Sequence, residues 1–336
     1  MAGYFTPHLD PMPAAVPPPV GTVTHANRRS RVLVPSSLAC LSTLPTVNLT
    51  AGCLHGCVYC YARAYSGYPG DGVAVLYEDL PQRLERELSR AKSRPHAVYF
   101  SPSSDLFQPH PDIQRCAEEV LEILFRHRVG VVFLTKGAIA EASMRLLETH
   151  AGLVQAQVGL LSTDAALAST FEPGAASPPA RLEQMRRLVA AGIPTVARVD
   201  PILPGISDGD EAFDRLFRAV RDTGVRDASA GILYTRPGIV AGLRRASGSM
   251  ASRVPAMLSR FPGERNMGLR GAGTTVIALP EQERMQIIER VSRHAIEHGI
   301  RLRVCACKNA DIASGTCGIA GAWRRPMRSH QLTLSL

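Results

Sequence analysis

The sequence is poor in lysine, since its 336 residues include only Lys92, Lys136 and Lys308. Arginine therefore carries nearly all of the positive charge that gives the chain a formal net charge of +9 and a pI near 9.4. A strongly basic balance favours a polyanionic partner such as nucleic acid. A codon bias toward arginine would produce the same composition with no role in binding, so charge alone is modest support for such a partner.

Long apolar runs are also missing. No stretch approaches the roughly 20 apolar residues needed to cross a bilayer. The first residues, MAGYFTPHLDPMP, lack a charged region followed by an apolar one. We therefore expect a cytoplasmic protein with no membrane partner. The content of 45% hydrophobic and 20% charged residues is ordinary for a globular enzyme.

The eight cysteines are unevenly distributed along the chain. Six of them fall into two tight groups, which would make poor cross-links but good metal ligands. Cys40 and Cys116 are left over, and for each we expect a buried, inert thiol.

The first group lies in residues 48–63, NLTAGCLHGCVYCYAR, between a short apolar run and an amphipathic segment. Cys53, Cys57 and Cys60 have C-x3-C-x2-C spacing, which lets three thiolates converge on one metal centre without long-range loop closure. Three ligands leave one iron of a 4Fe-4S cluster open for substrate or cofactor. The alternatives are a zinc site, with His55 as the nearest fourth ligand, or three scattered core cysteines.

The second group, Cys305, Cys307 and Cys317, has C-x-C-x9-C spacing and follows an expected strand. Thiols this close together in a reducing compartment indicate metal rather than disulfides. An auxiliary iron-sulfur cluster is the first interpretation, zinc the second and redox-active thiols the third. The fourth ligand is absent, or comes from Cys40, Cys116 or a group other than cysteine.

Short apolar runs alternate with segments of helical period from residue 45 onward. The expected strands are residues 46–50, 97–101, 130–135, 154–161, 194–199 and 228–234. The expected helices are residues 80–91, 112–126, 139–149, 179–191 and 211–223. Strands that alternate with helices at this spacing form βαβ units and a parallel sheet, here a partial (βα)6 barrel of the TIM type.

The chain is expected to divide into three parts. Residues 1–31 are rich in Pro and Ala and are expected to form a mobile arm. Residues 32–235 hold the barrel. Residues 236–336 form a C-terminal extension with an Arg-rich helical region, a helix at 280–298, a strand at 300–305 and the second cysteine group.

The pattern C-x3-C-x-aromatic-C, with Tyr59 as the aromatic residue, resembles the signature of the radical S-adenosylmethionine (SAM) superfamily. In that superfamily the amino and carboxylate groups of SAM bind the open iron. One electron then cleaves a carbon-sulfur bond and gives a 5′-deoxyadenosyl radical, which abstracts hydrogen from the substrate. The resemblance thus implies a 4Fe-4S cluster, SAM and an electron donor such as flavodoxin or ferredoxin.

Most of residues 45–208 resembles the spore photoproduct lyase family within that superfamily. The matching segments are GCLHGCVYCYAR, SSDLFQP, FLTKG, LLSTD, FEPGAASPPARLEQMRRLVAAGIP and DPILPGISD. The resemblance implies the same partial barrel and a photolesion in DNA as substrate. It also suggests site residues at the carboxyl ends of the strands, where parallel barrels carry their functional groups.

The resemblance assigns four residues to SAM binding. Ser104 would hold the methionine end of SAM and Lys136 would pair with its carboxylate. Ser162 would lie near the ribose, and Tyr59 would present its backbone to the adenine. For the two serines, a helix cap or a plain strand-end hydroxyl is the alternative.

Three further residues have weaker assignments. Glu172 and Arg198 are expected to make polar contacts across the barrel mouth, or an ion pair that only ties loops together. Gly205 would allow a close backbone approach to SAM, or would be an ordinary turn glycine.

The sequence departs from the spore photoproduct lyases at one catalytic position. In those enzymes a cysteine two residues before the SAM-binding serine delivers the final hydrogen atom, whereas this chain has Pro102 there. Tyr61 matches a tyrosine in the family's hydrogen relay and is the candidate catalytic residue, with simple packing as the alternative.

Three functions compete. The first is a DNA lyase that cleaves a pyrimidine photoproduct or photoadduct. In this case the arginines of residues 236–270 would bind the DNA phosphates. The second is a radical SAM enzyme that modifies RNA or a protein with help from an auxiliary cluster. The third is a non-catalytic nucleic-acid-binding module with a structural metal.

Overall fold

The structure is a computed structural model. It describes residues 21–36, 39–261, 263, 266–269, 274–306, 309, 311–313, 318–321 and 323. Within these residues, no helix is both long and apolar enough to cross a membrane.

The main sheet has eight strands in the order β13-β10-β9-β8-β7-β6-β3-β2. Its strands are β2 (Val34–Pro35), β3 (Pro45–Val47), β6 (Ala97–Phe100), β7 (Gly130–Thr135), β8 (Val154–Gly159), β9 (Thr195–Ile202), β10 (Asp227–Ile232) and β13 (Arg301–Val304). All neighbouring pairs are parallel except β2 with β3. Six consecutive parallel strands, β3 and β6 to β10, confirm the predicted partial (βα)6 barrel.

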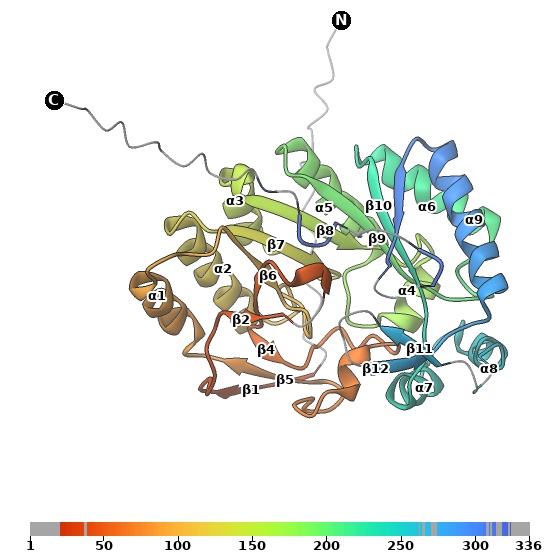
Figure 1. Ribbon diagram of the computed structural model, residues 1–336, viewed down its shortest axis with the longest axis horizontal. Coiled ribbons are helices and arrows are strands. Elements are labelled where there is room, and N and C mark those ends of the chain that lie inside the picture. The colour runs from red at the N-terminus through yellow and green to blue at the C-terminus, as the bar shows by residue number, and fades with distance from the viewer. Residues whose placement is uncertain are drawn as a thin grey trace, which may run out of the picture.

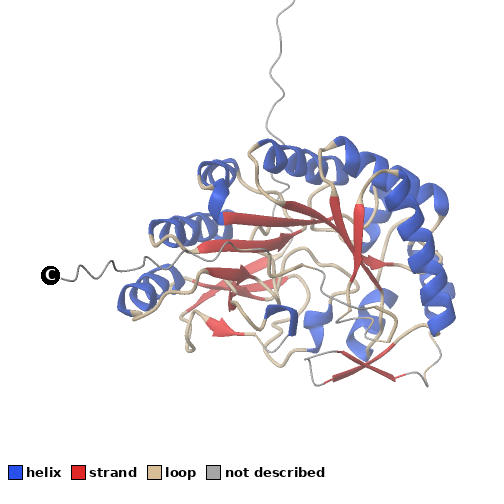
Figure 2. Cartoon of the chain, turned by 45° about the horizontal axis from the view of Figure 1, so that its top comes forward, coloured by secondary structure: helices blue, strands red, loops and turns tan. Residues whose placement is uncertain are grey.

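Helices cover the outer face of this sheet, as Figures 1 and 2 show. They are α1 (Leu80–Arg90), α2 (Pro111–Arg126), α3 (Glu141–Thr149), α5 (Pro178–Ala190), α6 (Asp210–Asp222) and α9 (Glu281–Glu297). The helices α4 (Ala165–Phe171), α7 (Pro237–Arg244) and α8 (Val254–Leu258) pack instead in a separate cluster with the loop that carries Val58 and Tyr59. Among the helices of the outer face, the agreement with the sequence is close. Five of them, α1, α2, α3, α5 and α6, match the expected helices to within two residues at each end.

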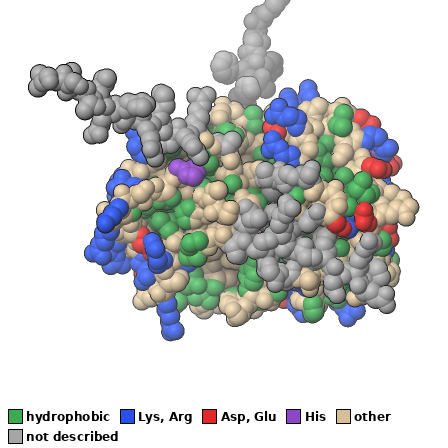
Figure 3. All heavy atoms as spheres, viewed as in Figure 1, with side chains coloured by type: hydrophobic (Ala, Val, Ile, Leu, Met, Phe, Trp, Pro, Cys, Tyr) green, Lys and Arg blue, Asp and Glu red, His purple; other side chains and the backbone are tan. Residues whose placement is uncertain are grey.

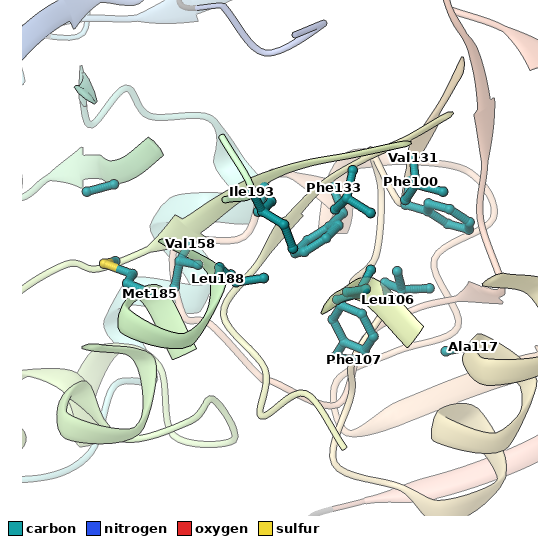
Figure 4. Packing of buried hydrophobic residues seen from close by; sticks show 14 of the residues in the cluster. Phe100, Leu106, Phe107, Ala117, Val131, Phe133, Val158, Met185, Leu188 and Ile193 are labelled. Atoms are coloured by element: carbon teal, nitrogen blue, oxygen red, sulfur yellow. The ribbon is translucent and has the colours of Figure 1, made fainter. Parts of the chain in front are cut away.

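The two faces of the sheet bury different clusters because side chains alternate along each strand. On β6, Val98 and Phe100 belong to the layer between sheet and helices. Tyr99 faces the barrel interior instead. In the outer layer, Phe133 of β7 projects toward Phe107, and their rings pack edge to face with centroids 5.4 Å apart (Figure 4).

A second, three-stranded sheet lies below the barrel in Figure 1, in the order β1-β5-β4. Its strands are β1 (Thr22–Ala26), β4 (Thr50–Ala51) and β5 (Val73–Tyr77). Residues 22–26 were expected in a mobile arm, but β1 pairs with β5 over five residues. The arm prediction is therefore wrong for this segment, while residues 1–20 lie outside the described residues.

The C-terminal region continues the barrel sheet. Helix α9 packs beside α6, and β13 adds to β10 in parallel. This confirms the expected helix and strand and shows that they repeat the βα pattern. Before them, α7 and α8 are followed by a hairpin of β11 (Asn266–Leu269) and β12 (Thr274–Ile277).

The segment after β13 enters the barrel interior. Ile319 is buried in the interior cluster, and Trp323 packs against that cluster. The Trp323 ring lies against Gly130 at the start of β7, where a Cβ atom would come within 2.5 Å of the ring. The indole nitrogen of Trp323 donates a hydrogen bond to the Ala320 carbonyl. Only glycine at position 130 leaves room for this ring.

Candidate active site

A cavity of about 360 Å³ opens where the barrel strands end, and it is lined by the first cysteine group. Its lining includes Cys53, Cys57 and Cys60, so the structure brings the three predicted cluster ligands to one space. The same wall holds Tyr59, Ser104 and Lys136. Ser162 does not line the cavity, and its hydroxyl accepts a hydrogen bond from the Asp164 amide.

The cluster loop is held by hydrogen bonds from its backbone to three other segments. The Leu54 amide donates to the Gln108 side chain at 2.8 Å. The Val58 amide donates to the Phe171 carbonyl, and the Gly174 amide donates to the His55 carbonyl. These bonds fix the loop between the start of α2 and the segment that follows β8.

Burial makes two of the loop thiols, those of Cys53 and Cys57, unfavourable as free thiolates. It raises the pKa of the Cys57 thiol to about 12, and burial together with the nearby Asp105 carboxylate raises the pKa of Cys53 well above its usual value. Thiolates at these positions therefore require a cation, which a metal ion or cluster supplies.

Asp105 organises the side of the cavity opposite the loop. One carboxylate oxygen accepts hydrogen bonds from the Thr135 hydroxyl at 2.7 Å and the Phe107 amide at 2.9 Å. The other accepts from the Lys136 amide at 2.9 Å and lies 3.5 Å from His55 Nδ1. Asp105 thus ties the end of β7 to the cluster loop. Sequence reasoning missed it, although it stands in the quoted SSDLFQP segment.

Three buried polar atoms of residues at the cavity wall have no hydrogen-bond partner among the described residues. They are the hydroxyls of Ser101 and Ser104 and Nε2 of His55. Burial lowers the pKa of His55, despite the opposing effect of Asp105, so its ring is neutral at pH 7. Partnerless polar atoms in a cavity that three thiols line fit a bound metal cluster and a polar cofactor.

Lys136 follows β7, and its ammonium lies over the Tyr59 ring at 5.7 Å from the centroid. A Cβ atom on Gly159 of β8 would come within 2.8 Å of Lys136 Cγ, so glycine there makes room for the lysine stem. No carboxylate of the described part of the chain lies within ion-pair distance of this ammonium. The lysine is therefore available to an anionic ligand.

Glu172 does not reach across the barrel mouth to Arg198. It forms a buried ion pair with Arg181 at 2.5 Å and accepts a hydrogen bond from the Tyr59 hydroxyl. Arg181 also donates to the carbonyls of Ala176 and Gly159. This pair links α4, α5 and β8 behind the cluster loop, and sequence reasoning had not identified Arg181.

Arg198 pairs instead with Asp200 on the same strand, with Nη2 2.9 Å from the carboxylate. Both line the cavity from β9. Gly205 has φ +75°, and its amide donates to the Asp208 side chain. It does not line the cavity, in keeping with a turn glycine.

Four tyrosines line another part of the cavity: Tyr61, Tyr65, Tyr99 and Tyr234. The Tyr61 hydroxyl donates a hydrogen bond to the Pro102 carbonyl, and its ring packs edge to face with Tyr65. Burial raises the pKa of Tyr61 well above its usual value, so the phenol keeps its proton at pH 7. A buried, protonated phenol is suited to donate a hydrogen atom.

The second cysteine group is described only in part. Cys305 is buried and lines the cavity. Cys307 and Cys317 lie outside the described residues. Cys116 is buried on α2, as expected, whereas Cys40 is half-buried and lines the cavity, so the expectation of a buried thiol is wrong for Cys40.

Among the described arginines of residues 236–270, Arg236 lines the cavity. Arg245 pairs with Asp71 at 2.8 Å, and Arg260 pairs with Glu283 at 3.0 Å. Two more arginines of this region lie outside the described residues: Arg265 and Arg270. On the face seen in Figure 3, Lys and Arg side chains stand at several separate places along the rim.

Comparison with known proteins gives one family match and several relatives. The model of the radical SAM superfamily matches residues 47–217. An uncharacterised protein of Mycobacterium tuberculosis (strain H37Rv) is 28% identical over 230 residues, which cover 65% of this chain and 68% of the relative. A radical SAM Nalpha-GlyT isomerase of Pseudomonas phage M6 is 26% identical over 168 residues, 49% of this chain and 35% of the relative.

A solved structure shares the fold. A spore photoproduct lyase variant with bound AdoMet and dinucleoside spore photoproduct superposes with a TM-score of 0.61 at 15% identity. The superposition covers 83% of this chain and 81% of that one. At this identity the likeness concerns the arrangement of the barrel and its helices.

Proposed function

The chain belongs to the radical SAM superfamily, and from this premise we propose that it is a DNA repair lyase that cleaves a pyrimidine photoproduct or photoadduct. Members of the superfamily use a 4Fe-4S cluster and SAM, so the protein is a radical SAM enzyme with these two cofactors. The proposal concerns two further points, namely the substrate and the bond that the enzyme cleaves.

In this proposal Cys53, Cys57 and Cys60 hold three irons of the cluster. Their spacing and their common cavity support the assignment, and so does the raised pKa of the Cys53 and Cys57 thiols. When bound, the cluster and SAM supply a 5′-deoxyadenosyl radical, given one electron from a donor such as flavodoxin or ferredoxin. The hydrogen bonds of the loop backbone hold the three cysteines in place.

Lys136, Ser104 and Tyr59 bind SAM in this proposal. The unpaired ammonium of Lys136 attracts a carboxylate, and the partnerless hydroxyl of Ser104 provides a hydrogen bond to the methionine end. Tyr59 is held by Glu172, which fixes the ring beside the lysine. Ser162 does not line the cavity, so its place near the ribose stays a prediction.

The observation that carries the DNA proposal is the combination of tyrosines and an arginine in the cavity wall. Tyr65, Tyr99 and Tyr234 present aromatic surface, and Arg236 adds positive charge near it, whereas the charge of Arg198 is balanced by Asp200. Proteins that flip a base out of a duplex stack it on aromatic or apolar side chains and read its polar edge. The cavity therefore suits a flipped pyrimidine attached to an anionic backbone.

Tyr61 is the proposed hydrogen donor to the substrate radical. Pro102 has no transferable hydrogen at the position where spore photoproduct lyases carry a cysteine. The Pro102 carbonyl instead accepts the hydrogen bond from the Tyr61 hydroxyl, which orients the phenol at the cavity wall.

The test is anaerobic reconstitution with iron and sulfide, followed by dithionite reduction in the presence of SAM. We expect 5′-deoxyadenosine to rise when ultraviolet-irradiated DNA is added, with repaired pyrimidines detected by mass spectrometry. Unirradiated DNA and a Cys57→Ala variant are the controls. If irradiated DNA leaves both products at the level of unirradiated DNA, the DNA lyase proposal is wrong.

A second candidate is a radical SAM enzyme that modifies RNA, a protein or a peptide, or rearranges a bond without cleaving it. It is favoured by one observation, the similarity to a phage protein named as a radical SAM isomerase. Irradiated RNA and peptide libraries in the same assay distinguish it, since only the true substrate class stimulates 5′-deoxyadenosine formation.

A further inference from the structure

One buried carboxylate, that of Asp105, contacts both the cluster loop of residues 53–60 and the backbone of Lys136. We propose that Asp105 is a positioning residue for SAM, which holds Lys136 at a fixed place relative to the cluster loop so that one ligand can reach both. The inference rests on the proposed role of Lys136 in SAM binding. It does not depend on which substrate the enzyme uses.

Both carboxylate oxygens of Asp105 accept hydrogen bonds at the carboxyl end of β7. One accepts from the Lys136 amide at 2.9 Å and the other from the Thr135 hydroxyl at 2.7 Å. The Thr135 oxygen in turn accepts from the Gly137 amide at 2.8 Å, and the Lys136 carbonyl accepts from the Ala176 amide at 2.8 Å. The backbone on both sides of the lysine is thus held, and its side chain is the part that can adapt to a ligand.

Gly137 brings this turn against the segment that carries Asp105. A Cβ atom at position 137 would come within 1.8 Å of the Phe107 carbonyl oxygen and 3.1 Å of His55 Nε2. The Phe107 amide also donates to Asp105 at 2.9 Å. Only glycine permits this approach, which places the Lys136 turn, the Asp105 segment and the cluster loop against one another.

The Asp105 segment is joined to the cluster loop through Gln108, which is fully buried. The side-chain oxygen of Gln108 accepts from the Leu54 amide at 2.8 Å, and its side-chain nitrogen donates to the Asp105 carbonyl at 3.0 Å. The Asp105 carboxylate itself lies 3.5 Å from His55 Nδ1. Two routes therefore connect Asp105 to the loop that carries the cysteines.

Charge balance does not explain why a carboxylate stands at this position. Asp105 is 5% exposed, and among the described residues no lysine or arginine forms an ion pair with it. Burial and the negative charge of Asp105 both raise the pKa of Cys53, so Asp105 opposes formation of that thiolate. A buried carboxylate is costly unless its oxygens are hydrogen-bonded. The contribution of Asp105 therefore lies in the acceptors that it offers to Lys136 and its neighbours.

The relative position of Lys136 and the cluster loop matters for any ligand that must reach both. Binding is tighter when such groups are already in place, because less freedom is lost on association. A residue that orients a ligand-binding group typically contributes about tenfold or more to affinity or activity. Asp105 acts through Lys136, so its effect on SAM should disappear when the lysine ammonium is absent. A purely structural role would not depend on the ammonium.

The test is a double-mutant cycle on the dissociation constant of SAM, measured by equilibrium dialysis with the anaerobically reconstituted protein. Asp105→Asn keeps the shape of the side chain, but its NH₂ group must face the amide of either Lys136 or Phe107, which cannot accept a hydrogen bond. We expect this variant to weaken SAM binding about tenfold when Lys136 is present, and less than about twofold in a Lys136→Met background.

Asp208→Asn is the matched control. Asp208 is 6% exposed and accepts a hydrogen bond from the Gly205 amide at 2.7 Å, but it does not line the cavity. Its replacement removes a comparable buried carboxylate and should leave the dissociation constant of SAM unchanged.

Thr135 provides a second measurement that leaves Asp105 in place. Thr135→Val removes the hydroxyl that links Asp105 to the Gly137 amide, whereas Thr135→Ser keeps it. We expect the valine variant to bind SAM about fivefold more weakly and the serine variant to bind as the unaltered protein does. The iron content and the urea midpoint of each variant show whether the cluster and the fold are intact.

The proposal is overturned by any of three results. They are a folded Asp105→Asn variant with unchanged SAM affinity, equal affinities of Thr135→Val and Thr135→Ser, and a loss that persists in full in the Lys136→Met background. If Lys136→Met itself leaves the dissociation constant unchanged, the premise is wrong and the proposal falls with it. Repair of irradiated DNA is measured in a separate assay, so these outcomes leave the proposed lyase function to its own test.

Discussion

The carboxylate of Glu172 and the guanidinium of Arg181 form an ion pair in which neither side chain is more than 1% exposed. Arg181 also bonds two backbone carbonyls, and Glu172 holds the hydroxyl of Tyr59. The pair lies directly behind the cluster loop, so its integrity and the position of Tyr59 depend on each other.

Arg181→Met should therefore destabilise the protein by about 3–5 kcal/mol, because Glu172 is left buried without a counter-charge. The double variant Arg181→Met, Glu172→Gln should recover much of this loss, since no charge then remains buried. Urea unfolding at pH 7 measures both. Arg145→Met, which breaks an exposed pair with Glu141, is the control and should cost no more than about 0.5 kcal/mol. If Arg181→Met and Arg145→Met lower the free energy of unfolding equally, the buried Glu172–Arg181 pair has no special role in stability.

The same pair predicts a pH dependence of stability. Burial alone would raise the pKa of Glu172, but the charges of Arg181 and Lys136 outweigh it and hold that pKa below 4.5. A carboxylate whose pKa is lower in the folded state stabilises the fold fully above the unfolded value. That contribution is lost as pH falls from about 4.5 through the folded pKa. Between pH 7 and pH 3, the urea concentration at the unfolding midpoint should fall less steeply for Glu172→Gln than for the unaltered chain. If the two midpoints fall in parallel, Glu172 does not contribute to the pH dependence of stability.

Lys136→Met should weaken SAM binding by about ten- to a hundredfold, which corresponds to a charge-assisted hydrogen bond of about 1.5–3 kcal/mol. Equilibrium dialysis with the reconstituted enzyme measures the dissociation constant. Lys92→Met removes an exposed lysine far from the cavity and should leave the constant unchanged. If both variants bind SAM as the unaltered enzyme does, Lys136 has no role in binding.

Tyr61→Phe should separate SAM cleavage from product formation. The ring and its packing are kept, so 5′-deoxyadenosine should still form. Repaired product should drop at least about tenfold, or about 1.4 kcal/mol in transition-state stabilisation, because the donor hydroxyl is gone. Tyr65→Phe, which alters a 48% exposed tyrosine in the same wall, should affect the ratio of the two products less. An unchanged ratio in Tyr61→Phe would exclude Tyr61 as hydrogen donor.

The repeating core of the fold could be predicted from sequence because its signals are local. Strand β7 matches the expected residues 130–135, since an unbroken run of apolar or small residues stands between the turn at Arg128 and Lys136. Strand β1 was missed because its side chains are mostly exposed and follow a Pro-rich segment, which leaves little alternation to detect.

The site was predictable where residue type and spacing define chemistry, as in the cysteine loop and Lys136. Asp105 and Arg181 could not be recognised, because a carboxylate after a strand and an arginine in a helix usually face solvent. Their importance comes from burial, which depends on contacts between segments far apart in the sequence. The same holds for Cys40 and Cys305, which line one cavity although they are far apart in the sequence.

The segment that carries Ile319 and Trp323 has an implication for biosynthesis. Translation produces the thiols at 53–60 early, but the interior that encloses their cavity is completed by residues close to the end of the described chain. A nascent polypeptide would therefore present an incompletely enclosed thiol loop until Ile319 and Trp323 have left the ribosome. Delivery of iron and sulfide after release, rather than during synthesis, is the order that this arrangement favours.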